Sequence, residues 1–428
     1  MNYNLRNKPI DYCIWGADLI DAGSREQMDS AMRLPISVTG ALMPDAHVGY
    51  GLPIGGVLAT ENAVIPYAVG VDIACRMRMT VFRASPTILK QQPGKFKNAL
   101  QEQTVFGAGG QWPNGLRVDH PVLDDPAWQE TGFLNHLKDK AYAQLGTSGS
   151  GNHFVEWGSF TIDEDNTQLD LEVGEYLALL SHSGSRGVGY QIADRFSKLA
   201  MDHHSDLDKS VKHLAWLPME SDLGQEYWMS MELAGRFAAA NHEVIHKQVA
   251  KAAGVKALAV VENHHNFAWK ELIPAPNGSE ETEHEVIVHR KGATPAGKGI
   301  LGIIPGSMGD PGFVVRGKGE AKSLESAAHG AGRAMSRRMA KSTLSKKECN
   351  AYLKERGVEL IGGGIDESPQ AYKRIEHVIA AQTDLVDVVG EFYPRIVRMD
   401  DGEKSRRTKQ ARSESKKKDK KRSKSRRR

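Results

Sequence analysis

Four short apolar runs constrain the fold of this chain most, because each ends in a loop rich in glycine, serine, asparagine or histidine. YLALL precedes SHSGSRG, ALAVVE precedes NHHNFAW, EVIV precedes HRKGATPAGKG, and GIIP precedes GSMGDPG. Glycine lacks the Cβ atom that would keep a ligand away from the backbone amides, so such loops can approach a ligand closely. Four of them in one chain predict a common polar cleft at one end of a sheet.

Amphipathic helices are expected between these runs. Residues 226–251 place apolar side chains at spacings of three and four, which indicates a helix. Residues 132–146, 188–201 and 323–341 are also expected to be helical. Short β-rich runs lie between the helices: VIPYAVGVDIA, YLALLS, ALAVVE, EVIVH, ILGIIP and FVVRG. This mixed order predicts an α+β fold, a single large domain over residues 1–402 with mixed β-sheets flanked by helices, and the polar cleft would lie at the strand ends.

The distribution of charge separates the last residues from this domain. Residues 404–428 hold 15 Lys or Arg and two acids, whereas residues 1–403 hold 41 basic and 51 acidic residues. The basic segment has no apolar side chain larger than alanine, so it cannot bury a face, and we expect residues 403–428 to be a disordered basic tail. Such a tail could bind phosphates without sequence preference, or it could be a solubilising extension.

Several protein classes are excluded by composition. No stretch approaches the roughly 18 uninterrupted apolar residues that suggest a membrane span, and the N-terminus lacks the apolar core of a secretion signal. Three cysteines (Cys13, Cys75 and Cys349) cannot build a disulfide framework. We therefore expect a cytoplasmic protein that does not associate with membranes.

One set of residues suits a metal site. A thiolate, a carboxylate and several imidazoles could bind one or two divalent ions, with the sulfur able to bridge. Most of the 16 histidines are expected to be surface or core residues, but His153, His182 and His265 lie in glycine-rich or asparagine-flanked segments. The candidates are Asp72 and Cys75 in GVDIAC, His153 in SGSGNHFVEW, His182 in SHSGSRG, and His264 and His265 in ENHHNFAW.

The residue types alone leave the identity of the metal open. Imidazole with thiolate favours zinc, whereas an added carboxylate and a phosphate substrate suit manganese. Four further histidines lie on segments with a helical pattern and are expected to be structural or solvent-exposed: His203, His204, His213 and His246.

Nucleotide binding is expected to use loops other than a P-loop, because neither GxxxxGK[ST] nor Lys-x-Asp-Gly is present. Phosphate contacts would come from residues 146–153, 305–312 and 329–333, although each alone could be an ordinary tight turn. Arg333 follows His329 by four residues and would share its face if the segment were helical. The imidazole of His329 could attack an α-phosphate, with arginine and metal stabilising the charge, or it could be a helix-start histidine packed close to glycine.

These motifs resemble those of the RtcB-type RNA ligases and occur in the same order. They are MPDAHVGYGLPIGG, GVDIAC, GTSGSGNHF, SHSGSRG, HHNFAW, HRKGAT, IIPGSMG and HGAGR, followed by SPQAYKRI. The resemblance covers residues 1–400. It implies an enzyme that uses GTP and two Mn²⁺ ions to join RNA ending in a 3′-phosphate or 2′,3′-cyclic phosphate to a 5′-hydroxyl end. The RNA would be a spliced tRNA or a broken RNA, the ligase a monomer, and an activator protein a further partner.

The resemblance also implies a role for individual residues. His329 would become guanylylated, and Arg186 would bind an RNA phosphate, while Arg290, Lys291 and Arg333 fall in or beside the loops of the cleft. The implied metal ligands are Asp72, Cys75, His153, His182 and His265, with the cysteine bridging two ions. The implied guanylate contacts are Asn152, His153, Phe154, Val155, Glu156, His265, Asn266, Pro305, Gly306, Ser307, Met308, His329, Gly330, Ala331 and Gly332.

The chain departs from the family's pattern in three places. Arg76 follows the cysteine where the family usually has glycine, which would place a cation beside the metals. Gly312 stands where a serine touches the nucleotide, and RIVRMDDG lacks the lysine that contacts guanine. These departures bear on nucleotide preference and on which RNA ends are joined. Two alternatives stay open: a metal-dependent nucleotidyltransferase that caps RNA or DNA 3′-phosphates without sealing, and a catalytically weak RNA-binding protein.

Overall fold

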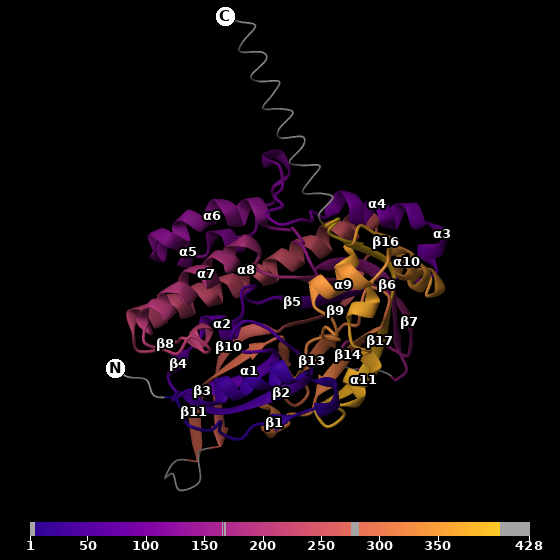
Figure 1. Ribbon diagram of the computed structural model, residues 1–428. Helices are drawn as coiled ribbons and strands as arrows, with labels where there is room; N and C mark the ends of the chain where they lie inside the picture. Colours follow the sequence, from indigo (N-terminus) through magenta and orange to yellow (C-terminus); the bar gives the residue numbers. More distant parts are fainter. Residues whose placement is uncertain (1–4, 165, 167, 275–281, 403–428) are drawn as a thin grey trace, which may run out of the picture.

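The computed structural model describes residues 5–164, 166, 168–274 and 282–402. Two β-sheets form the centre of the molecule, and helices cover one side of the larger sheet (Figure 1). This arrangement confirms the predicted α+β class. The expected basic tail, residues 403–428, lies outside the described residues, and the domain boundary at residue 402 stays a prediction.

The larger sheet has eight strands, and neighbours pair antiparallel except β16 with β17. The first and last strands of this sheet, which carry Ile303 and Asn263, lie close to each other. The amide of Ile303 donates to the Asn263 side chain (2.9 Å), and that side chain donates to the carbonyl of Ile303 (3.4 Å), so the sheet curves almost into a barrel. In order the strands are β13 (Leu301–Ile304), β14 (Gly312–Gly317), β17 (Val386–Met399), β6 (Phe154–Ile162), β7 (Gly174–Ser183), β5 (Arg76–Phe82) and β9 (Ala257–His264), with β16 (Glu359–Ile361) beside β17.

The smaller sheet has five strands and adjoins the larger one. The chain passes from β9 of the larger sheet to β10 of the smaller sheet through one residue, His265. In order the strands are β1 (Cys13–Ile14), β2 (Ser37–His47), β3 (Ile54–Thr60), β11 (Glu283–Lys291) and β10 (Asn266–Pro274). Two further pairs are β4 (Ala63–Val64) with β8 (Leu217–Pro218), and β12 (Ala293–Pro295) with β15 (Ser326–Ala328).

Strand register brings the candidate metal ligands to one edge of the larger sheet. Arg76 pairs with Ser183 in β7 and with His264 in β9. Phe154 in β6 pairs with His182. Cys75, His153 and His265, each one residue outside its strand, therefore lie at the same edge as His182.

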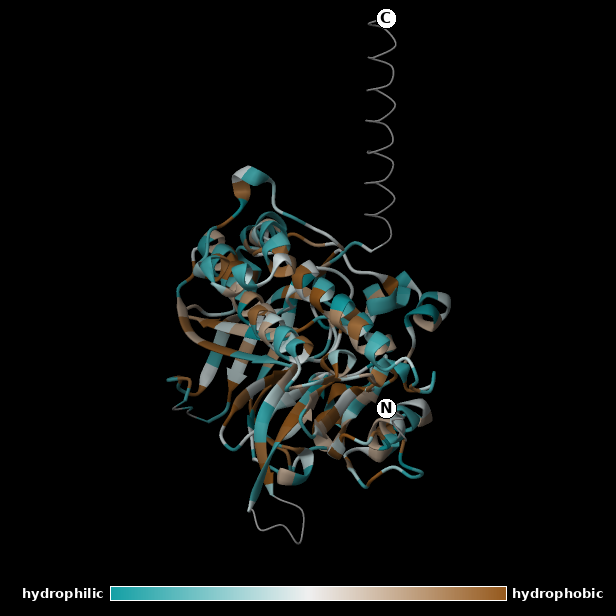
Figure 2. Cartoon of the chain, turned by 90° about the vertical axis from the view of Figure 1, so that its left-hand side faces the viewer, coloured by the Kyte–Doolittle hydropathy of each residue, from teal (hydrophilic) through white to brown (hydrophobic). Residues whose placement is uncertain are grey.

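The helices pack through an apolar core that includes Trp128, Phe196, Tyr227 and Phe237. The longest, α8 (Asp222–Ala253), begins where the Ser221 side chain accepts a hydrogen bond from Gly224 N. The hydrophobic and hydrophilic bands along the helices in Figure 2 reflect this one-sided burial. The other helices are α1 (Ala22–Met32), α2 (Pro66–Val69), α3 (Ile88–Gln91), α4 (Pro93–Gln103), α5 (Ala127–Glu130), α6 (Gly132–Gln144), α7 (Arg186–His203), α9 (Arg337–Thr343), α10 (Lys346–Glu355) and α11 (Ile375–Ala380). Within the described chain, no helix has the length and apolar character needed to cross a membrane.

Most of the elements predicted from sequence are confirmed. The helices expected at residues 132–146, 188–201 and 226–251 are α6, α7 and α8. The β-rich runs YLALLS, ALAVVE, EVIVH, ILGIIP and FVVRG are β7, β9, β11, β13 and β14. The strands of the first three runs extend further than expected, so that His182 and His264 belong to strands rather than to loops.

The helix predicted for residues 323–341 is wrong over most of its length, since only Arg337–Thr343 is helical. Leu324 and Glu325 adopt left-handed φ values of 54° and 46°, and residues 326–328 form β15, which pairs with β12. Tertiary pairing thus overrides the helix propensity of an alanine-containing segment. His329 and Arg333 lie in a loop, so the interpretation of His329 as a helix-start residue is also wrong.

The strand expected over VIPYAVGVDIA is wrong as well. Only its first residue, Val64, lies in a strand, and Pro66 begins the short helix α2. Proline fixes φ near the helical value and lacks the amide hydrogen that a strand ladder needs. The next strand, β5, begins only at Arg76.

Arg290 is a structural residue of the smaller sheet, and it does not lie in a loop of the cleft. Its guanidinium is 1% exposed and makes paired hydrogen bonds of 2.6 and 3.0 Å to the carboxylate of Glu271. It also donates to Ser326 Oγ and to the carbonyl of Leu324, and it stacks over the ring of Trp269. These contacts leave Arg290 no free face for RNA.

We therefore predict that Arg290→Ala destabilises the fold. Removal of the guanidinium breaks its bonds to Glu271, Ser326 and Leu324, and because Glu271 is 28% exposed the cost should be below that of a fully buried pair, about 2 kcal/mol. The exposed Arg316 in β14 offers a matched control, because Arg316→Ala should change the free energy of unfolding by less than about 0.5 kcal/mol. Urea unfolding measures both variants, and an Arg290→Ala protein as stable as wild type would contradict this assignment.

Candidate active site

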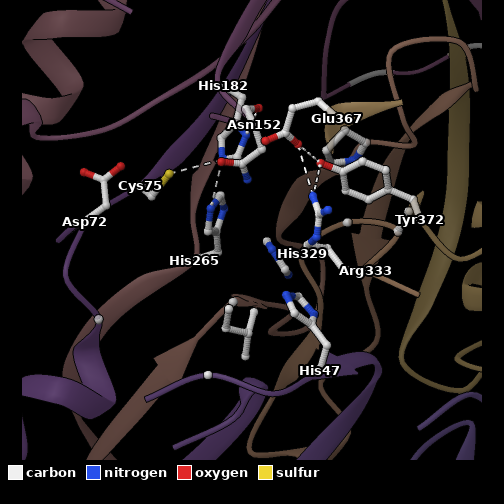
Figure 3. A pocket seen from close by; sticks show the side chains of 18 of the residues that line it. His47, Asp72, Cys75, Asn152, His182, His265, His329, Arg333, Glu367 and Tyr372 are labelled. Atoms are coloured by element: carbon white, nitrogen blue, oxygen red, sulfur yellow. Dashed lines mark hydrogen bonds and ion pairs between the residues drawn. The ribbon is translucent and has the colours of Figure 1, made fainter. Parts of the chain in front are cut away.

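A cavity of about 740 Å³ lies at the junction of the two sheets, and its wall combines strand ends with loops. The larger sheet contributes Cys75, His153 and His182, and the loop after β15 contributes His329. In Figure 3 the sulfur and the imidazoles of this region lie close together, with His329 toward the centre of the view. The structure therefore brings the predicted metal ligands and the predicted nucleophile to one cavity.

Cys75 is the centre of the candidate metal cluster. Its Sγ atom lies 3.1 Å from His182 Nε2 and 3.5 Å from His153 Nε2. His182 Nε2 lies 3.3 Å from His265 Nε2, and Asp72 Oδ2 lies 3.1 Å from His153 Nε2. The donor atoms of Cys75, His153 and His182 all lie within 4.8 Å of one another, and Asp72 and His265 each lie beside one of them, as a site for divalent ions requires.

The orientation of the imidazoles is fixed by hydrogen bonds on their far sides. His153 Nδ1 donates to the carbonyl of Ser148 at 2.8 Å, and His182 Nδ1 donates to the carbonyl of Asn152 at 3.2 Å. Each bond leaves the Nε2 atom directed at the cluster. A carbonyl partner on the second ring nitrogen is the usual way in which proteins orient a metal-binding histidine. These residues therefore fit a metal ion.

Protonation states also suit metal binding. Burial lowers the pKa of His182 to about 3 and lowers the pKa of His265 well below its ordinary value, so both imidazoles are neutral at physiological pH. Burial alone would raise the pKa of Asp72, but the hydrogen bond and charge of His153 and the charge of Arg186 outweigh it, and the pKa lies below its usual value. Burial, then the charge of Asp72, raises the pKa of the Cys75 thiol, so a bound metal would have to displace its proton.

Asn241, in α8, holds the two loops behind this cluster. Its Oδ1 atom accepts hydrogen bonds from the amides of Gly146 (2.8 Å) and Thr147 (3.1 Å). Its Nδ2 atom donates to the carbonyl of Thr147 and to Ser183 Oγ. A single buried amide therefore fixes the loop before His153 to the end of the strand that carries His182.

His329 is held by one oxygen of Asp45. Asp45 Oδ2 lies 2.6 Å from His329 Nδ1, and it also accepts hydrogen bonds from the amides of His329 (3.1 Å) and Gly330 (3.3 Å). A carboxylate accepts, so Nδ1 carries the proton and Nε2 keeps its lone pair. Among the described residues, Nε2 has no hydrogen-bond partner, and the ring centroid lies 4.8 Å from that of His265.

The loop around His329 depends on glycine at position 332. Gly332 has a φ of 71°, and a Cβ atom there would lie 2.1 Å from the carbonyl oxygen of Asp45. Both the backbone angle and the lack of space exclude a side chain. His47, two residues after Asp45, also lines the cavity, and burial lowers its pKa to about 4, which keeps it neutral.

Most of the expected guanylate contacts line the cavity, namely Asn152, His153, Phe154, His265, Asn266, Pro305, Gly306, Ser307, Met308, His329, Gly330, Ala331 and Gly332. Val155 and Glu156 do not. Val155 packs in the apolar core between α4 and the sheet. Glu156 is buried in β6 with Oε2 unpaired, and burial raises its pKa well above the ordinary value. Their contacts with a nucleotide stay predictions.

The basic residues expected near the cleft have different surroundings. Lys291 lines the cavity, and burial lowers its pKa to about 7. Arg333 also lines it and bonds to Glu367, to the Tyr372 hydroxyl and to the carbonyl of Asp366, as Figure 3 shows in part. Arg186 is half-buried beside Thr147 and His153 and is absent from the described wall of the cavity, so its contact with an RNA phosphate stays a prediction.

Two of the three departures from the family pattern lie away from the cavity. The Arg76 guanidinium donates to the carbonyl of Gly235 in α8 and pairs with Glu262, so the cation expected beside the metals is held by these partners and is absent from the described wall of the cavity. Gly312 begins β14, and it too is absent from the described wall of the cavity. The stretch without the expected lysine, residues 395–402, begins in β17, and the last residue of that strand, Met399, lines the cavity.

The sequence patterns did not identify Asp45, the partner of His329, or the cavity residues His47, Glu367 and Tyr372. Asp45 and His47 lie within the motif MPDAHVGYG, and this motif could have identified both as candidate site residues. Nothing in the sequence links Asp45 to His329, which is 284 residues away.

The lowered pKa values of the buried histidines predict an acid-sensitive fold. Burial lowers the pKa of His264 to about 3 and of His289 to about 4, below the value near 6.5 of an unfolded chain. The unfolded state then binds more protons, so stability is complete above about pH 6.5 and falls toward pH 4 by up to about 1.4 kcal/mol per pH unit for each such histidine. Urea unfolding of the metal-free protein at a series of pH values measures this slope.

A matched pair of variants tests the cause. His289→Gln should make the slope shallower, whereas His136→Gln, at an exposed position of α6, should leave it unchanged. A free energy of unfolding that does not change between pH 6.5 and pH 4 would contradict the assignment of buried neutral histidines.

Comparison with known proteins relates this cavity to a family. The family model described as tRNA-splicing ligase RtcB matches residues 27–126 and 124–400. The chain is 32% identical over 413 residues to the RNA-splicing ligase RtcB of Escherichia coli K12, covering 91% of this chain and 97% of the relative. It is 31% identical over 418 residues to the tRNA-splicing ligase RtcB of Nanoarchaeum equitans, covering 82% and 86%. The matched residues include every member of the candidate metal cluster and the loop of His329, and the chain belongs to the RtcB family.

Proposed function

We propose that this protein is an RNA ligase that uses GTP and manganese to join an RNA 3′-phosphate or 2′,3′-cyclic phosphate end to a 5′-hydroxyl end. Relatives named RNA-splicing and tRNA-splicing ligases support the reaction class. The observation that carries the proposal is the arrangement of His329: Nδ1 donates to Asp45, while Nε2 faces the cavity that holds the Cys75 cluster.

The first step is attack of His329 Nε2 on the α-phosphorus of GTP. An N–P bond forms, and the bond from the α-phosphorus to the pyrophosphate oxygen breaks, so pyrophosphate leaves with the electron pair. The imidazole becomes positively charged as it attacks. The Asp45 carboxylate, which accepts from Nδ1, stabilises that charge and keeps the nucleophilic lone pair on Nε2.

The next two steps transfer the nucleotide and seal the RNA. An oxygen of the RNA 3′-phosphate attacks the phosphorus of the guanylate, the N–P bond breaks, and Nε2 recovers its lone pair. The 5′-hydroxyl oxygen then attacks the activated 3′-phosphorus, loses its proton, and displaces GMP. His329 is therefore regenerated before sealing, and the sealing step needs no covalent bond to the protein.

Metal ions bound at the Cys75 cluster would withdraw charge from the phosphate oxygens that surround each reacting phosphorus. Asp72, Cys75, His153, His182 and His265 would hold them, and one sulfur with several imidazoles could serve two ions. The carboxylate of Asp72 together with phosphate ligands favours manganese over zinc in this mixed set.

We further propose that the ligase is a cytoplasmic monomer. One chain supplies every residue named in the site, so a second copy is not needed for the chemistry. All three cysteines are free, and Cys75 must stay reduced to bind a metal, which favours a reducing compartment.

Labelling with GTP tests the proposed function. The full-length protein, incubated with Mn²⁺ and GTP labelled on the α-phosphate, should acquire acid-labile label. His329→Ala should acquire no label because it lacks the nucleophile. Cys75→Ala should also acquire none, because it lacks a ligand of the proposed metal site. His136→Ala, at an exposed position, should acquire as much label as wild type. RNA with a 3′-phosphate and a separate 5′-hydroxyl strand then distinguishes sealing from capping. Absence of label on wild type, or full label on His329→Ala, would refute the proposal.

A second prediction concerns Asp45. In Asp45→Asn the amide can donate to Nδ1, which would move the imidazole proton to Nε2 and remove the nucleophilic lone pair. The rate of labelling should fall by about 10²-fold or more, the range expected for loss of a positioned proton acceptor. Asp202→Asn, an exposed position in α7, serves as the control. Thermal unfolding of both variants checks that they are folded, and an unchanged rate in a folded Asp45→Asn protein would show that Asp45 does not set the tautomer.

A further inference from the structure

Two tyrosines and a histidine form an aromatic cluster at the cavity. Tyr50 lies between β2 and β3, Tyr67 lies in α2, and His213 lies in the short 3₁₀ helix η4 (Lys212–Leu214). The ring of Tyr50 lies 6.4 Å from Tyr67 and 5.8 Å from His213, and the rings of Tyr67 and His213 are 4.9 Å apart, all measured between centroids. Tyr50 and Tyr67 both line the cavity that contains the Cys75 cluster and His329. We refer to these three residues as the rim aromatic cluster.

The backbone that carries Tyr50 is held on both sides. The Gln27 side chain bonds to both the amide (3.0 Å) and the carbonyl (2.6 Å) of Gly49, and the Lys291 ammonium donates to the carbonyl of Tyr50. Gly51 packs so closely on η4 that a Cβ atom there would lie 2.8 Å from the carbonyl oxygen of His213. The loop is therefore fixed to the cavity wall and to η4, and Tyr50 has a defined position.

Burial does not account for the aromatic and apolar side chains at this rim. Tyr50 is 68% exposed, and the neighbouring Val48 and Val71 are 57% and 43% exposed although both line the cavity. Exposed apolar side chains that gather at a binding cavity mark a surface that a ligand can cover. The apolar rim therefore complements the polar groups inside the cavity.

We propose that the rim aromatic cluster stacks on an unpaired nucleobase of the RNA strand whose end enters the cavity. The inference rests on the proposed function and specifies how that site holds its substrate. Single-stranded RNA presents flat apolar base faces, and aromatic side chains are their usual partners. Stacking tolerates any base, which suits an enzyme that joins ends of differing sequence.

The charge of the protein favours this contact over a purely electrostatic one. Residues 1–403 hold 41 basic and 51 acidic residues, so the body of the protein has no excess of cations with which to attract phosphates. The basic tail, residues 404–428, would bind RNA mainly through its phosphates, which an abasic nucleotide keeps. Base-dependent affinity must therefore come from the body, and the rim aromatic cluster supplies the matching surface.

The test compares RNA with and without a base near the 3′ end. Fluorescence anisotropy measures binding of the full-length protein to a short single-stranded RNA with a 3′-phosphate, and to the same RNA with an abasic nucleotide at each position near that end in turn. For wild type, loss of the stacked base should weaken binding by roughly five- to hundredfold. In Tyr50→Ala/Tyr67→Ala the dependence on that base should disappear.

Two further variants separate stacking from general damage. Tyr50→Phe keeps the ring and should retain the dependence on the base, and Tyr393→Ala, 37% exposed on β17, should behave as wild type. The basic tail contributes equally with both RNAs and cancels in the comparison. Retention of the full base dependence in Tyr50→Ala/Tyr67→Ala, or a wild type that binds abasic and intact RNA equally, would overturn the inference. Failure of wild type to become labelled by GTP would refute the proposed function instead and would leave this binding result intact.

Discussion

The three hydrogen bonds to Asp45 Oδ2 are the interaction on which the rest of the site depends. They join the end of β2 in the smaller sheet to the loop that follows β15, and they draw the amides of His329 and Gly330 out of any helical pattern. The same oxygen sets the tautomer of His329. Local fold and chemical reactivity are therefore determined by one buried carboxylate, with Gly332 leaving the space that the approach to Asp45 requires.

The two sheets position the second half of the site. Backbone hydrogen bonds fix the register of four neighbouring strands, β5, β6, β7 and β9. The residues just outside the ends of these strands must therefore lie at the same edge of the larger sheet. His265 then connects that edge to the smaller sheet, whose β2 carries Asp45. The candidate metal ligands thus lie at the edge of the larger sheet, whereas the candidate nucleophile, His329, lies in the loop after β15 and is held by Asp45 of the smaller sheet. The hydrogen bonds of Asn241 hold the intervening loops in place without taking part in the chemistry.

Sequence patterns predicted the α+β class and the long helix α8, because one apolar stripe or one short β-rich run suffices for each. The patterns also predicted the convergence of Cys75, His153, His182 and His265, since the three histidines lie in glycine-rich or asparagine-flanked segments and the thiol of Cys75 can share a metal with imidazoles. The patterns failed at residues 323–336, where a helix was expected. There the backbone of β15 pairs with β12, and the amide of His329 donates to Asp45, so these groups do not form the hydrogen bonds of a helix. They could not identify Asp45, since a contact across 284 residues leaves no periodic signal. Arg290 and Arg76 looked available to ligands because sequence shows charge but not the partner that neutralises it.

We propose His329 Nε2, oriented by Asp45, as the nucleophile. Peptide mapping by tandem mass spectrometry can identify it, since the method locates a guanylate adduct on a single side chain. After incubation of the full-length protein with Mn²⁺ and GTP, followed by digestion at neutral or alkaline pH to preserve an N–P bond, we expect one adduct, on the peptide that contains His329. An adduct on another side chain, such as the cavity residue Lys291, with His329 unmodified, would contradict it.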